Sequence, residues 1–280
     1  MSQSLPSTSG SHRALSLAHL SLITCPPDQL VALAAEAGFG HVDLRLSPAT
    51  PTDRVYGDDE RMQLCRALLP LLRQTGMRVW DVEIIRITER TRPEDHLPLM
   101  EAAGLLGARR IKTVCDCEDP VLAAALLARL ADLAAPFGLT VDLEYMIFSG
   151  VKSLCAALAT VEAATRPNLQ VLVDALHWMR AGDTVADIRA APASRIGYVQ
   201  LCDGPRQGST GREALITEAR TRRWPPGEGE FPLPALLEAM PSACPVSIEV
   251  PLPPGEDLLQ HARRLFTAAR SVVEKQEAAP

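Results

Sequence analysis

The stretch Leu139-Thr-Val-Asp-Leu-Glu144 contains the alternation that decides the fold. Val141 and Leu143 share one phase of this stretch, and the two acidic residues share the other. Because successive strand side chains point to opposite faces, one face is apolar and the other acidic. In a closed barrel one strand face lies under helices and the other fills the lumen. Glu144 is then an inward-facing residue at the carboxyl end of a strand.

Three later stretches repeat this alternation. The apolar residues of one phase are Val171 and Val173, then Val199 and Leu201, then Val246, Ile248 and Val250. The polar residues of the opposite phase, near the carboxyl ends, are Asp174, Gln200 and Glu249. The carboxyl ends of the strands are where barrel enzymes keep their active sites.

The spacing of such runs predicts the topology. Strand candidates begin near Ala14, His41, Arg78, Arg110, Leu139, Gln170, Ile196 and Pro245. Helical Ala/Leu stretches separate them; we expect Asp28 to cap the first helix, and Asp119-Pro120 to open a helix that ends at Phe137-Gly138. Eight such units in one chain predict a single (β/α)8 TIM barrel. The rival, a doubly wound open sheet, is less favoured because no GxGxxG follows the first strand.

We expect the 280 residues to form a single barrel domain, 13–274, with a loose tail at each end, 1–12 and 275–280. No linker divides the chain, and the Pro/Gly/Arg-rich segment 203–234 is interpreted as a functional loop.

A net charge of −6 argues against a nucleic-acid partner. Apolar runs are shorter than the roughly 20 residues of a membrane span. An odd number of scattered cysteines indicates a reducing cytoplasm rather than a disulfide framework.

Glu144, Asp174, Gln200 and Glu249 fall on consecutive strands and form a candidate metal site. Three carboxylates so close would repel unless a cation neutralised them. Oxygen ligands suit Mg²⁺ or Mn²⁺, with Zn²⁺ or Co²⁺ as further candidates. The alternative is a polar lumen satisfied by water or a basic neighbour.

Four more residues are candidate substrate ligands. Arg45 and Glu83 have inward phases, although a buried ion pair is an equal alternative. His177 follows Asp174 by three residues and could bind a substrate hydroxyl or transfer a proton, or be an ordinary loop histidine. Arg223 in the long loop could clamp a carboxylate or phosphate, or be solvated beside other arginines.

These motifs together resemble the xylose-isomerase-like sugar phosphate isomerase/epimerase superfamily over about residues 15–269. The resemblance rests on Leu143-Glu144, on Val171-Leu-Val-Asp174-Ala-Leu-His177, on Tyr198-Val-Gln200-Leu-Cys-Asp203-Gly, on Arg223-Trp-Pro-Pro-Gly-Glu-Gly-Glu and on Ser247-Ile-Glu249-Val. Most sugar epimerases and isomerases of this group have histidine where this chain has Gln200. Glutamine there resembles bacterial 3-dehydroshikimate dehydratases.

The resemblance implies a divalent-metal-dependent isomerase or epimerase for a sugar, sugar phosphate or related keto-polyol. Glu144 and Glu249 would abstract and return a proton α to a carbonyl, through a metal-stabilised enediolate. The alternatives are a metal-dependent dehydratase, in which a β-hydroxyl leaves, and a non-catalytic sugar-acid-binding barrel. The expected partner is a polyhydroxylated keto compound, with no nucleic acid and no membrane; a homo-oligomer is left open.

Overall fold

The computed structural model describes residues 13–50 and 53–277. Within these ranges the strands are β1 (Leu15–Ala18), β2 (His41–Arg45), β3 (Arg78–Ile87), β4 (Arg110–Cys115), β5 (Thr140–Glu144), β6 (Leu169–Asp174), β7 (Ile196–Leu201) and β8 (Val246–Ile248). They form one closed barrel in sequence order, with all neighbours parallel and β8 paired back to β1. The predicted (β/α)8 barrel is confirmed, and the open sheet is excluded.

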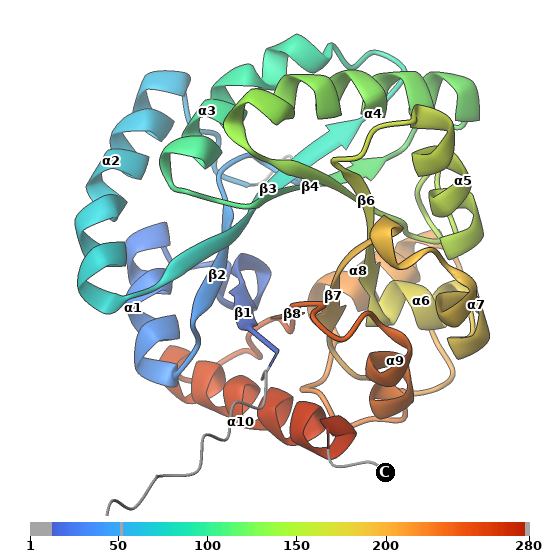
Figure 1. Ribbon diagram of the computed structural model, residues 1–280. Coiled ribbons are helices and arrows are strands. Elements are labelled where there is room, and N and C mark those ends of the chain that lie inside the picture. Colours follow the sequence, from blue (N-terminus) through green and yellow to red (C-terminus); the bar gives the residue numbers. More distant parts are fainter. Residues whose placement is uncertain (1–12, 51–52, 278–280) are drawn as a thin grey trace, which may run out of the picture.

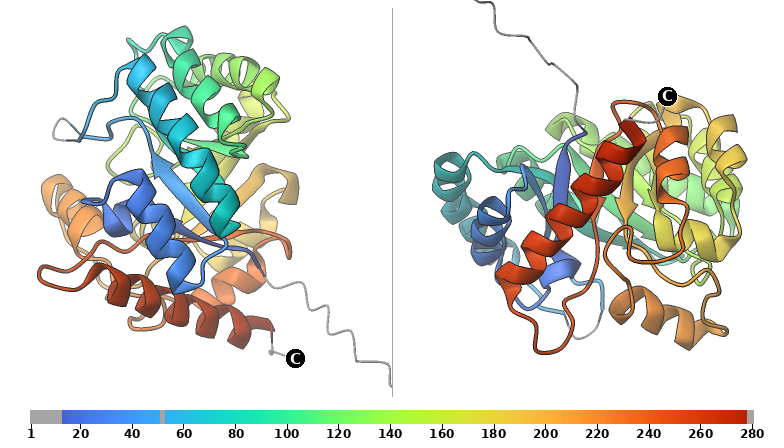
Figure 2. Two further views of the ribbon diagram at one scale, coloured as in Figure 1. Left: turned by 90° about the vertical axis from the view of Figure 1, so that its left-hand side faces the viewer. Right: turned by 90° about the horizontal axis from the view of Figure 1, so that it is seen from below.

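Helices form a ring around the strands (Figure 1). The α-helices are α1 (Pro27–Ala37), α2 (Asp58–Thr75), α3 (Leu97–Leu105), α4 (Pro120–Ala134), α5 (Leu154–Ala164), α6 (Ala175–Ala181), α7 (Val185–Ala190), α8 (Arg212–Thr221), α9 (Leu233–Ala239) and α10 (Leu258–Glu277). Short 3-10 turns are η1 (His19–Leu22), η2 (Pro93–His96), η3 (Ala135–Phe137) and η4 (Ala193–Arg195). Helix α10 packs beside α1 and α9 and closes the ring between the first and last units (Figure 2).

The predicted strand phases are confirmed. Each strand begins within one residue of its predicted start. The outward-phase residues of β5 to β8 pack against the helices and are fully buried: Val141, Leu143, Val171, Val173, Val199, Leu201, Val246 and Ile248. This apolar layer between sheet and helices holds the barrel closed, which leaves the inward phase free to carry polar groups.

Two helix-end predictions have different outcomes. Asp119 caps α4 as predicted, because its side chain accepts hydrogen bonds from the amides of Val121 and Leu122. The prediction for Asp28 is wrong. Helix α1 begins one residue earlier, at Pro27, whose fixed φ suits the first helical position. Asp28 therefore lies in the first turn, where its charge faces the positive end of the helix dipole.

The segment 203–234 is more ordered than the sequence indicates. It contains α8, and Asp203 forms a β-bridge to Trp224 that ties its two halves together. At the carboxyl end, α10 runs to Glu277, so the predicted tail 275–280 is helical over its first three residues. The predicted tail 1–12 lies outside the described residues.

Residues 120–137, which span α4 and η3, are long and apolar enough to cross a membrane by length and composition. In the barrel this segment is an outer helix. One face packs on the fold through Ala123, Leu127, Leu130, Ala131 and Ala134. In all, 33% of the segment is buried in the barrel, and the helix also packs beside α5.

Candidate functional site

The four predicted ligands lie together at the carboxyl end of the barrel. Glu144 and Asp174 end β5 and β6, Gln200 lies in β7, and Glu249 follows β8 directly. Oxygen atoms of the three carboxylates all lie within 4.8 Å of one another. The amide Nε2 of Gln200 lies 3.4 Å from Oε1 of Glu249. All four side chains are buried.

Asp174 is held in place by the start of the next helix. As the N-cap of α6, its Oδ1 accepts hydrogen bonds from the backbone amides of Leu176 and His177. This arrangement satisfies one carboxylate oxygen and fixes the rotamer. The other oxygen, Oδ2, lies 2.5 Å from Nη1 of Arg223.

Two buried cations pair with the carboxylates. Arg223, from the loop after α8, also places Nη2 at 3.0 Å from Oε2 of Glu249. Lys112, from the middle of β4, places Nζ at 3.0 Å from Oε1 of the same carboxylate. Both side chains are almost fully excluded from solvent. Glu249 is therefore clamped on both oxygens.

The environment moves the pKa values of the two glutamates apart. Burial alone would raise the pKa of Glu249, but the charges of Lys112 and Arg223 outweigh it and lower that pKa to about 2. For Glu144, burial raises the pKa to about 8; Lys112 opposes the rise, and the neighbouring Glu249 and Asp174 add to it. Such a divergence is characteristic of acid–base pairs in active sites.

The donor set fits a divalent cation. All four groups offer oxygen, which suits hard cations. Oε1 of Gln200 is buried without a hydrogen-bond partner among the described residues, and a buried carbonyl oxygen is rarely left unpaired. Among the described residues Glu144 has no cation within hydrogen-bond distance, since Nζ of Lys112 is 3.9 Å away. A metal ion in place of the proton on Glu144 would satisfy both groups.

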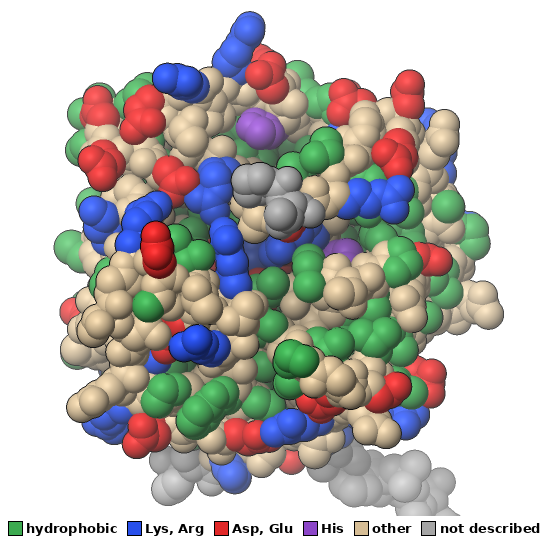
Figure 3. Space-filling model, turned by 180° about the vertical axis from the view of Figure 1, so that it is seen from behind, with side chains coloured by type: hydrophobic (Ala, Val, Ile, Leu, Met, Phe, Trp, Pro, Cys, Tyr) green, Lys and Arg blue, Asp and Glu red, His purple; other side chains and the backbone are tan. Residues whose placement is uncertain are grey.

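A cavity of about 280 Å³ opens above this floor. Figure 3 shows the barrel mouth, where Lys and Arg side chains gather around the central hollow. Glu144, Glu249, His177, Arg223 and Arg45 line it. Three of the four predicted substrate ligands, the histidine and the two arginines, therefore face this space.

Glu83 does not line the cavity. Its carboxylate is fully buried, with Oε2 at 2.8 Å from Nη2 of Arg45 and Oε1 at 3.2 Å from Nζ of Lys112. Of the two interpretations of the Arg45–Glu83 pair, the buried ion pair is the one present. We therefore assign Glu83 to holding Arg45 and Lys112 in position, and correct its predicted substrate contact.

His177 stands beside Glu144, with Nε2 at 3.7 Å from Oε1 of that residue. Its ring meets the ring of Phe148 edge to face, with centroids 5.4 Å apart. Burial lowers the pKa of His177 to about 4, the charge of Asp174 opposing this and that of Arg223 reinforcing it. At neutral pH the imidazole is therefore uncharged and can donate or accept a hydrogen bond.

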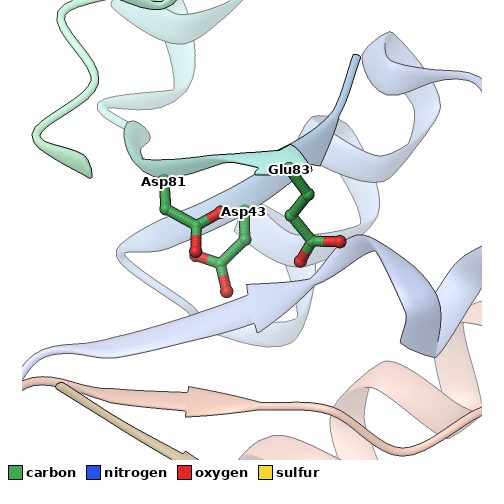
Figure 4. Close-up of side chains that lie close together, drawn as sticks. All are labelled: Asp43, Asp81 and Glu83. Atoms are coloured by element: carbon green, nitrogen blue, oxygen red, sulfur yellow. The ribbon is translucent and has the colours of Figure 1, made fainter. Parts of the chain in front are cut away.

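A second acidic group lies deeper in the lumen. Figure 4 shows Asp43 from β2 and Asp81 and Glu83 from β3, with the carboxyl groups of Asp43 and Asp81 facing each other. One oxygen of each of the three carboxylates lies within 4.8 Å of the other two. Asp43 accepts hydrogen bonds from the hydroxyls of Ser16 and Ser247, and Asp81 from that of Tyr198. Burial and Glu83 raise the pKa of Asp43 to about 7, against the opposing hydroxyls. The pKa of Asp81 is raised well above its usual value by burial and by Asp43.

Asp203 anchors the loop that carries Arg223. Its Oδ1 accepts hydrogen bonds from the amides of Gly204 and Phe231, at 2.8 and 2.9 Å, and Oδ2 accepts one from Gly227 at 2.9 Å. The start of the segment and two positions near its end thus converge on one buried carboxylate. Nε of Arg223 in turn donates to the carbonyl of Ala219 at 2.6 Å.

Sequence reasoning assigned no role to Lys112, which touches three of the acidic residues. One available signal is the alternation of Arg110 and Lys112 with Ile111 and Thr113 along β4. The other is scarcity, because the chain has only three lysines and this one lies inside a strand, between Ile111 and Thr113.

Known structures share this fold. One is a fusion protein of a xylose isomerase-like TIM barrel with 4-hydroxyphenylpyruvate dioxygenase (20% identity, TM-score 0.75); the match covers 95% of this chain and 43% of that one. Another is L-ribulose 3-epimerase (16%, TM-score 0.70, 95% and 96% covered). A third is the probable 3-DHS dehydratase AsbF of Bacillus anthracis (13%, TM-score 0.69, 92% and 98% covered). At these identities the likeness shows the fold alone.

No curated protein sequence matches the chain. The sequence pattern described as "Xylose isomerase-like TIM barrel" matches residues 31–269. That span begins within α1, ends within α10 and includes the four predicted ligands, Glu144, Asp174, Gln200 and Glu249. The chain therefore belongs to the xylose isomerase-like TIM barrel family.

Proposed function

We propose that this protein is a divalent-metal-dependent isomerase or epimerase that moves a proton α to the carbonyl of a small polyhydroxylated keto compound. The observation that carries the proposal is the contrast between Glu144 and Glu249, two carboxylates in one cavity whose pKa values the site shifts in opposite directions. Beside them lies the Gln200 oxygen that has no hydrogen-bond partner among the described residues. Glu144, Asp174, Gln200 and Glu249 would hold the cation. The bound cation would withdraw electrons from the substrate carbonyl and so acidify the neighbouring C–H.

Glu144 is the group best placed to exchange a proton at neutral pH. Its nearest cationic atom is Nζ of Lys112 at 3.9 Å, whereas both oxygens of Glu249 lie 3.0 Å from a cation, so Glu144 is the freer of the two carboxylates to accept a proton. Glu249, held ionised by Lys112 and Arg223, would receive the proton only with difficulty. We assign it to the opposite side of the substrate as ligand and fixed negative charge.

Neutral His177 would orient a substrate hydroxyl beside Glu144, since its Nε2 lies 3.7 Å from that carboxylate. Apolar residues exclude water from the reacting carbon; those lining the cavity include Ile84, Val114, Met146 and Phe148. Exclusion of water strengthens each charge contact in the site.

A dehydratase is the second candidate, favoured by Gln200 at the position where the resemblance to sugar epimerases expects histidine. The first step would be the same proton removal, followed by loss of a β-hydroxyl. The solved structures of the same fold include both an epimerase and a probable dehydratase, so the fold favours neither outcome. We also propose a reducing, cytoplasmic setting, because the seven cysteines, all within the described ranges, are free.

The test is a substrate panel in D₂O with protein loaded with Mn²⁺ or Mg²⁺, followed by NMR. Ketohexoses, ketose phosphates and a cyclic keto acid are the probes. Deuterium at the α carbon with all hydroxyls retained supports the isomerase or epimerase. Loss of water to an unsaturated product supports the dehydratase. Metal-loaded protein that binds these compounds without exchange or conversion would contradict both and favour a binding barrel.

A further inference from the structure

The cavity above the metal ligands is lined by more cations than carboxylates. The carboxylates are those of Asp53, Glu144 and Glu249, and the cations are those of Arg45, Arg86, Lys112, Arg220 and Arg223. Lys112 and Arg223 pair with Glu249, and the other three arginines are called the rim arginines. The concentration of basic side chains around the hollow is visible at the barrel mouth (Figure 3).

Two of the rim arginines already have acidic partners. Arg45 pairs with Glu83 at 2.8 Å, and Arg86 pairs with Asp116 from the end of β4. Their charges are balanced by the protein itself. These two side chains therefore shape the rim without requiring a ligand.

Arg220 is different. It extends from the last turn of α8, is exposed to solvent, and forms no ion pair within residues 13–50 and 53–277. The charged groups around it are mainly positive, because Arg86 and Arg45 oppose its own charge and only Asp53 favours it.

Asp53 also lines the cavity, but its carboxylate is hydrogen-bonded within its own loop. Its carboxylate accepts hydrogen bonds from the amides of Ala49 and Thr50 and from the hydroxyl of Thr50. It also lies 3.8 Å from Arg45. Arg220 is thus an exposed guanidinium at the cavity wall that no carboxylate of the described residues neutralises. Guanidinium groups bind phosphate and carboxylate bidentately.

We propose that Arg220 binds an oxyanion on the substrate, so that the compound handled here carries a phosphate or carboxylate at the end remote from its keto-hydroxyl group. This inference rests on the proposed function for the identity of the reacting end. An oxyanion contact at Arg220 would favour ketose phosphates or hydroxylated keto acids as substrates over neutral ketoses. The cavity of about 280 Å³ suits a compound of this size.

The test compares charged ligands with neutral counterparts on metal-free protein by titration calorimetry. One pair is fructose 6-phosphate and fructose; the other is shikimate and its methyl ester. The variants are Arg220→Met and, as a control with the same loss of charge, Arg222→Met, which is exposed two residues further on and outside the cavity lining.

In wild type, the affinity for at least one charged ligand should exceed the affinity for its neutral counterpart by about tenfold or more, as expected for a charge-assisted contact. Arg220→Met should abolish that preference, and Arg222→Met should retain it. The pair that shows the preference identifies phosphate or carboxylate. Equal affinities in wild type, an unchanged preference in Arg220→Met, or equal loss in both variants would overturn the proposal.

The two proposals fail separately. Absence of exchange and conversion in every metal-loaded sample would contradict the proposed function, yet an Arg220-dependent preference on metal-free protein would still stand. Conversely, deuterium exchange into neutral ketoses without any charge preference would overturn the assignment of Arg220 alone.

Discussion

Nζ of Lys112 lies 3.0 Å from Oε1 of Glu249, although the two residues are 137 positions apart and come from opposite sides of the barrel. The same ammonium lies 3.2 Å from Oε1 of Glu83. One buried cation therefore joins a structural carboxylate of β3 to a candidate ligand after β8. Burial lowers the pKa of Lys112, but the surrounding glutamates outweigh it and raise that pKa well above its usual value.

Lys112→Met should destabilise the fold strongly at about pH 8. It would leave Glu249 and Glu83 buried without their shared cation, and removal of one partner of a buried pair costs about 3–5 kcal/mol. The loss should shrink as pH falls, because protonation of the carboxylates removes their uncompensated charge. Urea unfolding at two pH values measures both effects. Lys152→Met, which removes an exposed lysine, is the control; equal losses in the two variants would contradict the role of Lys112.

Glu144→Gln and Glu249→Gln should separate stability from catalysis. Because the pKa of Glu144 is raised, its folded form holds a proton that the unfolded chain has lost by neutral pH. Glutamine resembles that protonated form without the cost of binding a proton on folding, so at neutral pH Glu144→Gln should be as stable as wild type or more stable. Glu249→Gln removes the charge that pairs with Lys112 and Arg223 and should cost about 2–4 kcal/mol.

Both variants should lose most of the α-proton exchange in the D₂O assay, each through a different cause. Glu144→Gln removes the proton acceptor, whereas Glu249→Gln removes a charge and alters the cation site. Thermal or urea unfolding without metal provides the stability comparison. A larger stability loss in Glu144→Gln than in Glu249→Gln would show that the pKa assignments are reversed.

The strand phases explain why so much of the site follows from the sequence. Outward residues such as Val171 and Val173 must be apolar to pack under helices, so a polar residue in the opposite phase can only face the lumen. Parallel strands bring their carboxyl ends to one face, which places Glu144, Asp174 and Gln200 together before any distance is known.

The buried ion pairs could not be predicted from strand phase, because they depend on the register between neighbouring strands. The β3–β4 pairing shifts between Val82 and Ile85, and this irregularity determines the height at which Glu83 stands relative to Lys112. Helix α8 was missed for another reason. It is held largely by Glu218, whose Oε1 lies 2.6 Å from Nη2 of Arg180, rather than by a regular apolar stripe.

Asp81→Asn should make the protein relatively more stable as pH rises from about 5 to 8. The pKa of Asp43 is about 7 and that of Asp81 is raised further, so between about pH 4 and 7 the folded pair binds a proton that the unfolded chain has released. Wild-type stability contributed by this pair is therefore lost as pH rises through the folded pKa.

An asparagine at position 81 has no such proton to lose, and its amide can face Asp43 while its oxygen accepts from Tyr198. The difference in unfolding free energy, variant minus wild type, should increase by about 1–3 kcal/mol over this range. Asp59→Asn, exposed in the first turn of α2, should show no comparable change. A difference that is flat or declines with pH would contradict the shared proton.

Asp203→Ala should loosen the loop over the barrel mouth. The carboxylate accepts from three backbone amides, and their loss leaves those amides without partners. Hydrogen exchange at Gly204, Gly227 and Phe231 should accelerate by about tenfold or more. Asp257→Ala, which removes an acceptor for the amides that begin α10, should leave these three rates unchanged. Unaltered exchange in Asp203→Ala would show that the loop is held by other contacts.

Gln200→Met tests the cation site without disturbing its charges. Oε1 of Gln200 is buried without a partner among the described residues, and Nε2 makes only a 3.4 Å contact with Glu249. Methionine has a similar length and no oxygen, so the metal-free variant should be as stable as wild type or slightly more stable. The affinity for Mn²⁺ should nevertheless fall by about tenfold or more, because one of four oxygen donors is gone.

Gln170→Met is the matched control on the neighbouring strand. Gln170 uses both ends of its amide, accepting from Arg110 and donating to the carbonyl of Ser194, each at 2.9 Å. Its replacement should lower stability and leave Mn²⁺ affinity unchanged, the opposite pattern to Gln200→Met. Calorimetric titration with Mn²⁺ and urea unfolding without metal give the two measurements for each variant. If Gln200→Met bound Mn²⁺ as tightly as wild type, the unpaired oxygen would not be a ligand, and the cation would have to be held by the three carboxylates alone.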